Sequence, residues 1–422
     1  MTSTTRPPGL AGSGMISVAE ARDLVLAAIT PLTPRRVTIG EAAGHILAEP
    51  VRASEAVPRF ANSAMDGYAV RAADVTGVPV RLQVTGTVAA GDGPKATVHP
   101  GEAMRIMTGA LLPPGADAVC RVEHTRAEDG GSAILIQEAV ATGTNVRHPG
   151  EDIAAGAQVC TPGTRLTPAH IGVLASLSIG DLLVYPRPTV GVLSTGDELA
   201  APGEALPPGK IRDANRPALL AQLRADGFHS ADLGIGGDDQ EMLADRLREA
   251  ASRCDAILAT GGVSIGDHDV LKVVLEKLGG ATMRSLLVAV KPGQRVAVAS
   301  VGEQRIPAFG LPGNPVAALV TYELFVRPAL RAMAGCRNPD RPRIAAIAEA
   351  ALPRRPGPKL HVVRVTARAG KDGVLRVRPT DGQESHMLRA MAAANALALV
   401  PDGHGILAGG RVEVLLLDAD GL

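Results

Sequence analysis

The hydrophobic pattern between residues 189 and 278 alternates between short apolar runs and longer amphipathic segments. The apolar runs have the length of buried strands, and the longer segments have the length and pattern of helices. Strands are expected at 189–194, 229–235 and 255–260, and helices at 216–226, 239–253 and 268–278. This alternation predicts an α/β domain with a mostly parallel sheet and helices on both faces.

The pattern is different on both sides of this region. A helix is expected to begin after Ser17, which can form a capping box with Glu20. Residues 55–150 contain short runs of Val and Thr broken by Gly and Pro, which predicts a small β domain. A long helix is expected with Pro315 near its start and Gly335 past its end, and the strand-like pattern after it predicts a second β domain at the C-terminus.

Composition excludes several classes of function. Lys plus Arg and Asp plus Glu are 43 each, so net charge gives no indication of a nucleic-acid or membrane surface. Only three Tyr and four Phe are present, with no Trp, which argues against base stacking. No apolar run has the roughly 20 residues that a membrane span needs. The four cysteines lack CxxC spacing and are expected to be free thiols in a reducing cytoplasm.

A glycine loop lies at the predicted junction of strand 255–260 and the helix that follows it. Gly261, Gly262, Gly266 and Ser264 stand where free backbone N–H groups could bind an anion. The Lys and Ser/Thr of a P-loop are replaced here by Asp267 and His268, so a simple NTPase is not supported. A purely structural alternative is a tight turn whose carboxylates cap the helix.

Acidic residues follow three successive strands of the predicted sheet. They are Glu198, Asp238 and Asp269, and loops at the carboxyl ends of parallel strands gather on one edge. Carboxylates beside phosphate repel it unless a divalent cation lies between them, and Mg²⁺ uses this combination of ligands. The acids therefore predict a magnesium and phosphate site, although each could separately be an N-cap.

Several further segments carry candidate binding groups. Lys291 in "VKPGQR" can offer a point charge to phosphate, and Pro312 and Pro315 enclose a stiff turn into a helix start with N–H donors. Asp66 in "FANSAMDGYAV" and Thr108 in "RIMTGALLPPGADAV" lie in turns of the first β region. Taken singly, such residues are explained by turn chemistry.

The order of these motifs resembles one protein family. "NSAMDGYAV", "RIMTGALLPPGADAV", "NVRHPGEDI", "STGDEL", "TGGVSIGDHD", "KPG" and "LPGNPVAAL" occur in that order between residues 62 and 319. The chain is similar to MoeA-type molybdopterin molybdenumtransferases, a family that includes the E domain of gephyrin. The resemblance covers about residues 15–420. It implies a cytoplasmic homodimer of elongated, L-shaped subunits, each a multi-domain α/β plus β chain with a MogA-like α/β pterin-binding domain.

The resemblance also assigns the predicted segments to domains. They are a disordered tail at 1–14, a linking helical and extended domain at 15–54 and 151–187, an inserted β domain at 55–150, an α/β molybdopterin-binding domain at 188–336 and a C-terminal β barrel at 337–422. The family inserts molybdate into adenylylated molybdopterin with Mg²⁺-dependent release of AMP. Its substrate is made by a partner molybdopterin adenylyltransferase, and molybdoenzyme-maturation proteins are further possible partners.

Site residues follow from the resemblance at matching positions. It implies catalytic roles for Asp66, Glu198, Asp238 and Asp269, with the last three as Mg²⁺ ligands. It implies substrate binding by Thr108, Asp152, Gly261, Gly262, Ser264, Lys291, Pro312, Pro315, Arg364 and Ser385. Some of these groups would act across the dimer.

Two positions depart from the family pattern. Gln294 and Leu287 stand where many members have Lys, and Arg212, Arg284 or Arg295 could replace the lost charge. Two other functions therefore stay open beside molybdenum insertion. One is a non-catalytic paralogue that binds the pterin or serves as a scaffold. The other is a Mg²⁺-dependent nucleotide hydrolase that uses only the α/β domain, and the β-domain motifs argue against it.

Overall fold

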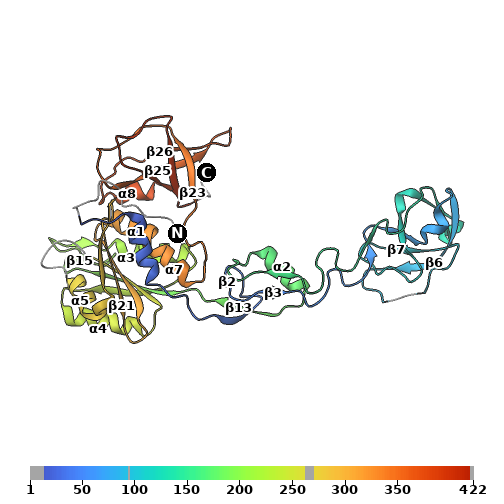
Figure 1. The fold of residues 1–422 in the computed structure, drawn as a ribbon, viewed down its shortest axis with the longest axis horizontal. Coiled ribbons are helices and arrows are strands. Elements are labelled where there is room, and N and C mark those ends of the chain that lie inside the picture. Colours follow the sequence, from blue (N-terminus) through green and yellow to red (C-terminus); the bar gives the residue numbers. More distant parts are fainter. Residues whose placement is uncertain (1–13, 94–95, 262–269, 419–422) are drawn as a thin grey trace. The chain divides into compact units, whose positions relative to one another are not determined.

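The computed structural model describes residues 14–93, 96–261 and 270–418 (Figure 1). The chain forms two compact units. One comprises residues 36–184, and the other combines the residues before 36 with residues 185–422. Within the described ranges, no helix is both long and apolar enough to cross a bilayer.

The 36–184 unit contains two separate sheets with their own cores. The larger has six strands in the order β8-β5-β7-β6-β10-β9, and its core contains Tyr68, Leu82 and Ile134. Its strands are β5 (Gly67–Val70), β6 (Val80–Val88), β7 (Glu102–Ile106), β8 (Ala118–Arg121), β9 (Thr125–Glu128) and β10 (Ala133–Ile136). The predicted β character of this region is therefore confirmed.

The smaller sheet of this unit has three strands and packs with one helix. Its order is β1-β13-β2, and Leu174 of α2 lies in the same core as Leu182. The elements are β1 (Arg35–Thr38), β2 (Ile46–Leu47), α2 (Pro168–Ser176) and β13 (Asp181–Tyr185). Two two-stranded sheets complete the unit, one formed by β3 (Val51–Arg52) with β12 (Gln158–Cys160) and the other by β4 (Asn62–Ser63) with β11 (Val146–Arg147).

The second unit contains the predicted α/β domain. Its sheet has the order β17-β14-β18-β22-β21-β19, in which the first four strands are parallel to one another and β21 pairs antiparallel with both β22 and β19. The strands are β14 (Thr189–Thr195), β17 (His229–Gly236), β18 (Ala256–Thr260), β19 (Arg284–Leu287), β21 (Arg295–Val301) and β22 (Ile306–Leu311). The helices are α1 (Val18–Ala27), α3 (Asn215–Ala225), α4 (Gln240–Ala251) and α5 (Val270–Gly279). The mostly parallel sheet is therefore confirmed.

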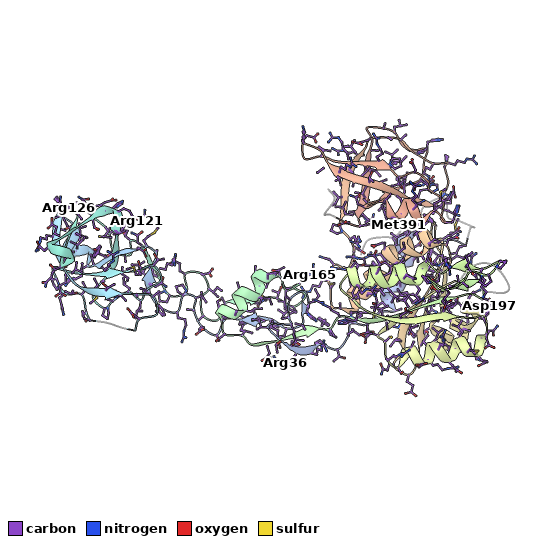
Figure 2. All side chains as sticks on the ribbon, turned by 180° about the vertical axis from the view of Figure 1, so that it is seen from behind. Arg36, Arg121, Arg126, Arg165, Asp197 and Met391 are labelled. Carbon is purple, nitrogen blue, oxygen red and sulfur yellow. The ribbon has the colours of Figure 1, made fainter. Side chains whose placement is uncertain are left out.

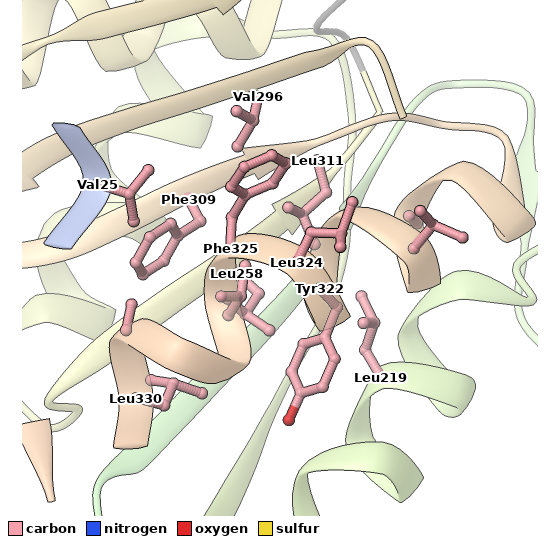
Figure 3. Packing of buried hydrophobic residues seen from close by; sticks show 14 of the residues in the cluster. Val25, Leu219, Leu258, Val296, Phe309, Leu311, Tyr322, Leu324, Phe325 and Leu330 are labelled. Carbon is pink, nitrogen blue, oxygen red and sulfur yellow. The ribbon is translucent and has the colours of Figure 1, made fainter. Parts of the chain in front are cut away.

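Helices cover both faces of this sheet, so its central strands are buried on both sides. On β18, Leu258 belongs to the same buried cluster as residues of α1 and α3, whereas its neighbours Ile257 and Ala259 belong to the cluster that contains residues of α4 and α5. Figure 3 shows the first of these cores, in which Phe309 and Phe325 lie among aliphatic side chains. The capping box of Ser17 and Glu20 begins α1, as predicted.

The long helix predicted after Pro315 is interrupted. It consists of α6 (Pro315–Thr321), a π-helical segment at Tyr322–Val326 and α7 (Arg327–Met333). Pro328 has no N–H to donate to the Leu324 carbonyl, and the wider turn lies immediately before it. The hydrophobic pattern indicates the helix but not this change of hydrogen bonding.

The C-terminal region is a closed five-stranded barrel, β25-β26-β23-β29-β27, which closes through the pairing of β25 with β27. The strands are β23 (Arg343–Ala348), β25 (Leu360–Ala369), β26 (Leu375–Pro379), β27 (Ala396–Val400) and β29 (Arg411–Leu416), with α8 (Leu388–Ala392) before β27. Short strands β24 (Leu352–Pro353) and β28 (Gly405–Ile406) pair with each other.

The barrel packs directly on the α/β domain. Val362 and Leu397 of the barrel belong to the same buried cluster as the α/β core, and Met391 of α8 packs against it (Figure 2). Strand β20 (Val290–Lys291) leaves the α/β domain and pairs with β25. This continuous apolar contact places loops of the barrel beside the edge of the sheet.

Candidate active site

The carboxyl ends of the central strands form one edge of the α/β sheet. The Thr195 hydroxyl at the end of β14 donates to the Thr260 carbonyl at 3.1 Å. The Gly261 N–H donates to the Leu311 carbonyl at 3.3 Å, which joins β18 to β22. A side chain at Gly261 would lie 2.3 Å from the Thr195 carbonyl oxygen, so only glycine allows these strand ends to approach.

A cavity of about 840 Å³ lies between this edge and the loop that precedes α8 of the barrel. It is called the edge cavity below. Six residues singled out from the sequence line it: Glu198, Gly261, Lys291, Pro312, Pro315 and Ser385. The volume is sufficient for a ligand of nucleotide size.

Glu198 lies in the exposed loop between β14 and β15 (Leu199–Ala200). Its carboxylate folds over Gly196, where an added Cβ would lie 2.3 Å from Oε2. Figure 2 labels Asp197 in the same loop, and its Oδ1 accepts the Asp238 N–H at 3.2 Å. Because Gly196 also donates to the Gly236 carbonyl at 3.1 Å, the acidic loops after β14 and β17 lie beside each other.

Asp239, the acid that follows Asp238, has a structural role. Asp239 is the N-cap of α4, and its Oδ1 accepts the Met242 N–H at 2.9 Å. Asp238 is exposed beside it but does not line the edge cavity. Among the residues that the structure describes, no three His, Cys, Asp or Glu side chains are close enough to hold a metal ion. Asp269, together with Gly262 and Ser264, lies outside the described residues.

The turn between Pro312 and Pro315 is fixed from two directions. Asn215 donates from Nδ2 to the Gly313 carbonyl at 2.7 Å, and Asn314 donates from Nδ2 to Ser385 Oγ at 3.0 Å. Pro315 has no N–H, and the Val316 N–H donates to the Ser385 carbonyl at 3.2 Å. One of the expected N–H donors at this helix start, that of Val316, is therefore already used by the barrel loop.

A buried polar cluster supports the floor of the cavity and was not predicted from the sequence. Ser194 Oγ donates to Asp213 Oδ1 at 2.8 Å and lies 3.1 Å from Thr260 Oγ1. Asp213 also accepts from Arg216 Nε at 2.9 Å. Its position in "RDAN" gives no signal for this role, because Ser194 and Thr260 come from β14 and β18.

Lys291 and Arg364 line a second cavity of about 690 Å³ on the barrel side of the first. Arg364 is 1% exposed, and its Nη2 donates to the carbonyls of Gly382 and Glu384, both at 3.3 Å. Gln383 forms a reciprocal pair with the Arg364 main chain, accepting from its N–H and donating to its carbonyl, each at 3.0 Å. Arg364 therefore shapes the loop that carries Ser385.

The remaining predicted residues belong to the 36–184 unit. The Thr108 N–H and hydroxyl both donate to Asp66 Oδ1, at 2.7 and 2.8 Å. The Thr108 backbone N–H, followed by the hydroxyl, lowers the pKa of the Asp66 carboxyl from its ordinary value. Asp152 is exposed, and its N–H donates to the Val57 carbonyl at 3.0 Å.

The cysteines offer no additional chemistry. All four are free thiols, as predicted, and Cys120, Cys160 and Cys254 are buried. Burial raises the pKa of Cys120 to about 11, so this thiol stays protonated at neutral pH.

The arginines suggested as replacements for the missing lysines differ in position. Arg212 and Arg295 line the edge cavity, whereas Arg284 donates to the carbonyls of Ala281 and Met283. Leu287 does not line the cavity and pairs with Arg295 across two strands.

These features define a multi-domain α/β plus β protein with a polar, nucleotide-sized cavity at a sheet edge. Three family models match it in order: the MoeA N-terminal region (domain I and II) at residues 16–178, the probable molybdopterin binding domain at 191–332, and the MoeA C-terminal region (domain IV) at 346–417. The chain is 38% identical to molybdopterin molybdenumtransferase 2 of Mycobacterium tuberculosis over 413 residues, covering 95% of this chain and 99% of the relative. It is 35% identical to the molybdopterin molybdenumtransferase of Bacillus subtilis, covering 90% and 89% of the two chains.

A solved structure agrees over the full length. The molybdopterin biosynthesis MoeA protein from Pyrococcus horikoshii matches with a TM-score of 0.79 and 29% identity, covering 95% of this chain and all of that chain. The chain therefore belongs to the molybdopterin molybdenumtransferase family. The members of this family are transferases of molybdenum cofactor biosynthesis.

Proposed function

We propose that this protein inserts molybdenum from molybdate into adenylylated molybdopterin and releases AMP in a Mg²⁺-dependent reaction. The edge cavity carries this proposal, because it combines Lys291 and the 312–315 turn with Glu198 in one space of about 840 Å³. The named relatives support molybdopterin and molybdate as the substrates.

The cavity's cationic side is suited to the anionic parts of both substrates. Lys291 is exposed there as a point charge, and Arg295 and Arg212 add guanidinium groups to the lining. Asn314 Nδ2 donates to Ser385 Oγ in the same lining, so a substrate that contacts Ser385 Oγ would find it already oriented. These residues would bind and orient the pyrophosphate and the oxyanion.

Magnesium is proposed to lie beside the acidic loops that follow β14 and β17, of which Glu198 lines the edge cavity and Asp238 does not. Glu198 and Asp238 are exposed carboxylates on adjacent loops, and carboxylate oxygens are ligands that Mg²⁺ accepts together with phosphate oxygens. One or two carboxylates are sufficient for Mg²⁺ when substrate phosphate oxygens complete its coordination, and Asp269 is the third proposed ligand. When bound, Mg²⁺ would neutralise phosphate charge. Glu198 would offer a carboxylate ligand to the ion, and Lys291 would bind the phosphate-bearing part of the substrate in the same cavity.

Asp66, Thr108 and Asp152 are proposed to act on the substrate from the 36–184 unit. The two hydrogen bonds from Thr108 keep the Asp66 carboxylate ionised and oriented, which supports a functional role for an exposed acid. We also propose a cytoplasmic homodimer in which these groups serve the partner's cavity, with a molybdopterin adenylyltransferase as supplier of the substrate. Light scattering at micromolar concentration tests the dimer, and a mass near 43.2 kDa would contradict it.

The test of the activity is AMP release from adenylylated molybdopterin with and without molybdate. Glu198→Gln and Asp238→Asn should bind the adenylate but release AMP slowly across a Mg²⁺ titration, because each keeps its shape and loses its charge. Asp245→Asn, in an exposed i,i+3 pair with Arg248 on α4, is the matched control and should behave as wild type. Wild-type protein that binds the adenylate but never releases AMP would instead support the non-catalytic pterin-binding alternative.

A further inference from the structure

Gln294 and Lys359 form a side-chain pair between the α/β domain and the barrel. Lys359 Nζ donates to Gln294 Oε1 at 2.8 Å. Both residues line the edge cavity, and Lys359 also lines the barrel-side cavity. The pair joins residues 65 positions apart in the sequence, so the pattern around "KPGQR" gives no indication of it.

The backbone of Lys359 is fixed by neighbouring elements. The next residue, Leu360, donates its N–H to the Ala289 carbonyl at 2.8 Å and pairs with Val290 across β20 and β25. The Lys359 carbonyl accepts from Nη1 of buried Arg354 at 2.7 Å. With its main chain and ammonium group both held, Lys359 loses less side-chain freedom on binding an anion than a free surface lysine would.

The same pairing places a second lysine nearby. Lys291 pairs with His361 in the register of β20 and β25, and it shares both cavities with Lys359. Within the described part of the chain, neither lysine forms an ion pair with a carboxylate, although Glu384 also lines both cavities. Burial lowers the pKa of His361, and the charges of Arg354, Lys291 and Lys359 lower it further. Lys291, Lys359 and Arg354 are therefore close enough to one ring to act on it together.

We propose that Lys359 binds the oxyanion substrate together with Lys291, and that Gln294 is the positioning residue that aims the Lys359 ammonium into the edge cavity. The ligand is a tetrahedral oxyanion, for which two ammonium groups supply charge and hydrogen-bond donors without bidentate geometry. This inference rests on the proposed function and assigns the oxyanion as molybdate. The phosphates of the adenylate have similar chemistry, so the experiment separates the two sources.

The main test uses Lys359→Gln and the exchange variant Gln294→Lys/Lys359→Gln. The exchange moves the positive charge across one hydrogen bond and keeps an amide and an ammonium in the pair. Molybdate binding is measured directly by equilibrium dialysis at two salt concentrations. Lys359→Gln should weaken molybdate binding about tenfold and reduce its salt dependence, because one of the local charges is lost. The exchange variant and Lys359→Arg should recover most of the affinity.

Lys371→Gln, in the exposed turn after β25 of the same barrel, is the control and should bind molybdate as wild type does. The half-saturating concentrations of molybdate and of the adenylate in AMP release are measured for the same variants. An increase confined to molybdate supports the assignment. An increase confined to the adenylate, or unchanged molybdate binding by folded Lys359→Gln, overturns it.

Failure of the proposed function gives a different result. In that case wild type would release no AMP on molybdate addition, while dialysis would still report whether Lys359 contributes to oxyanion binding. Wild-type protein that does not bind molybdate in the dialysis experiment overturns the Lys359 assignment as well. Circular dichroism melting of every variant ensures that a loss of binding is compared only between folded proteins.

Discussion

Asn314 and Ser385 connect the two domains that border the edge cavity, because Nδ2 of Asn314 donates to Oγ of Ser385 at 3.0 Å. The Ser385 carbonyl accepts the Val316 N–H at 3.2 Å, so the same serine is also held through its main chain. The barrel loop therefore completes a wall of the cavity that the α/β domain does not form by itself.

Replacing Ser385 with Ala separates these two contacts. The main-chain bond remains, and loss of the side-chain bond should lower the free energy of unfolding by about 1 kcal/mol. If Ser385 contacts substrate, AMP release should fall by far more than this stability loss explains. Ser252→Ala removes a hydroxyl that donates to the Glu249 carbonyl at 2.7 Å on the surface, and serves as the control. Equal activity of the two variants would contradict substrate binding by Ser385.

Arg341 should be important for stability because it neutralises a buried acid. Its Nε and Nη2 donate to the two Glu323 oxygens at 2.6 and 3.1 Å, and the Glu323 side chain is 2% exposed. Arg341→Met should cost about 3–5 kcal/mol, since it leaves the carboxylate buried without this partner. Urea unfolding midpoints measure the effect. Arg343→Met, which breaks an exposed pair with Glu413, should cost at most about 1 kcal/mol.

The cost of Arg341→Met should also depend on pH. Burial raises the pKa of Glu323 in the folded protein, and Arg341 is the principal group that opposes this rise. Without Arg341 the folded pKa rises further above the unfolded value. A raised folded pKa contributes stability that is present below the unfolded pKa and is lost as pH rises through the folded pKa. The variant should therefore be less destabilised at pH 5 than at pH 8. A constant difference between variant and wild type would contradict this explanation.

Thr108→Val should raise the pKa of Asp66 without returning it to the ordinary value. The substitution removes the hydroxyl donor at 2.8 Å but keeps the backbone donor at 2.7 Å, which contributes most to lowering this pKa. Because the folded pKa of Asp66 is depressed, its stabilising contribution exists above the unfolded pKa and is lost as pH falls through the folded pKa. NMR titration of the carboxyl carbon measures the change. Thr142→Val, whose hydroxyl donates to Asp117 instead, should leave Asp66 unchanged.

The hydrophobic pattern predicts the elements correctly where local pattern determines structure. The apolar runs before Gly196 and Gly261 gave β14 and β18 within one residue, because a central parallel strand is buried on both faces. The residues that line the edge cavity from the α/β domain follow from those strand ends. The barrel's contribution was harder to foresee. The pairing of Gln294 with Lys359 and the support of Ser194 by Asp213 arise from tertiary contacts, which no periodicity in the chain reports.

Arg295 rather than a lysine at position 287 should supply charge to the edge cavity. Leu287 lies outside the cavity lining, so Leu287→Lys should change molybdate binding little. Arg295 lines the cavity beside Gln294, and Arg295→Ala should weaken binding several-fold and reduce its salt dependence. Arg284→Ala is the control, because that guanidinium is turned to the carbonyls of Ala281 and Met283. Molybdate titration at two salt concentrations tests all three, and an effect of Leu287→Lys alone would reverse the assignment.

Gly196→Ala tests whether the position of Glu198 matters for activity. Gly196 has φ +141°, and an added Cβ would lie 2.3 Å from Glu198 Oε2, so the carboxylate must leave its place over the glycine. The backbone conformation also disfavours alanine, which should cost about 1–2 kcal/mol of stability. Gly203→Ala separates these effects, because Gly203 has φ +90° but nothing within 4 Å of the added methyl group. Both variants should unfold at lower urea concentration than wild type, whereas only Gly196→Ala should slow AMP release at saturating Mg²⁺. Equal slowing in both would mean that backbone strain, and not displacement of the Glu198 carboxylate, limits the reaction.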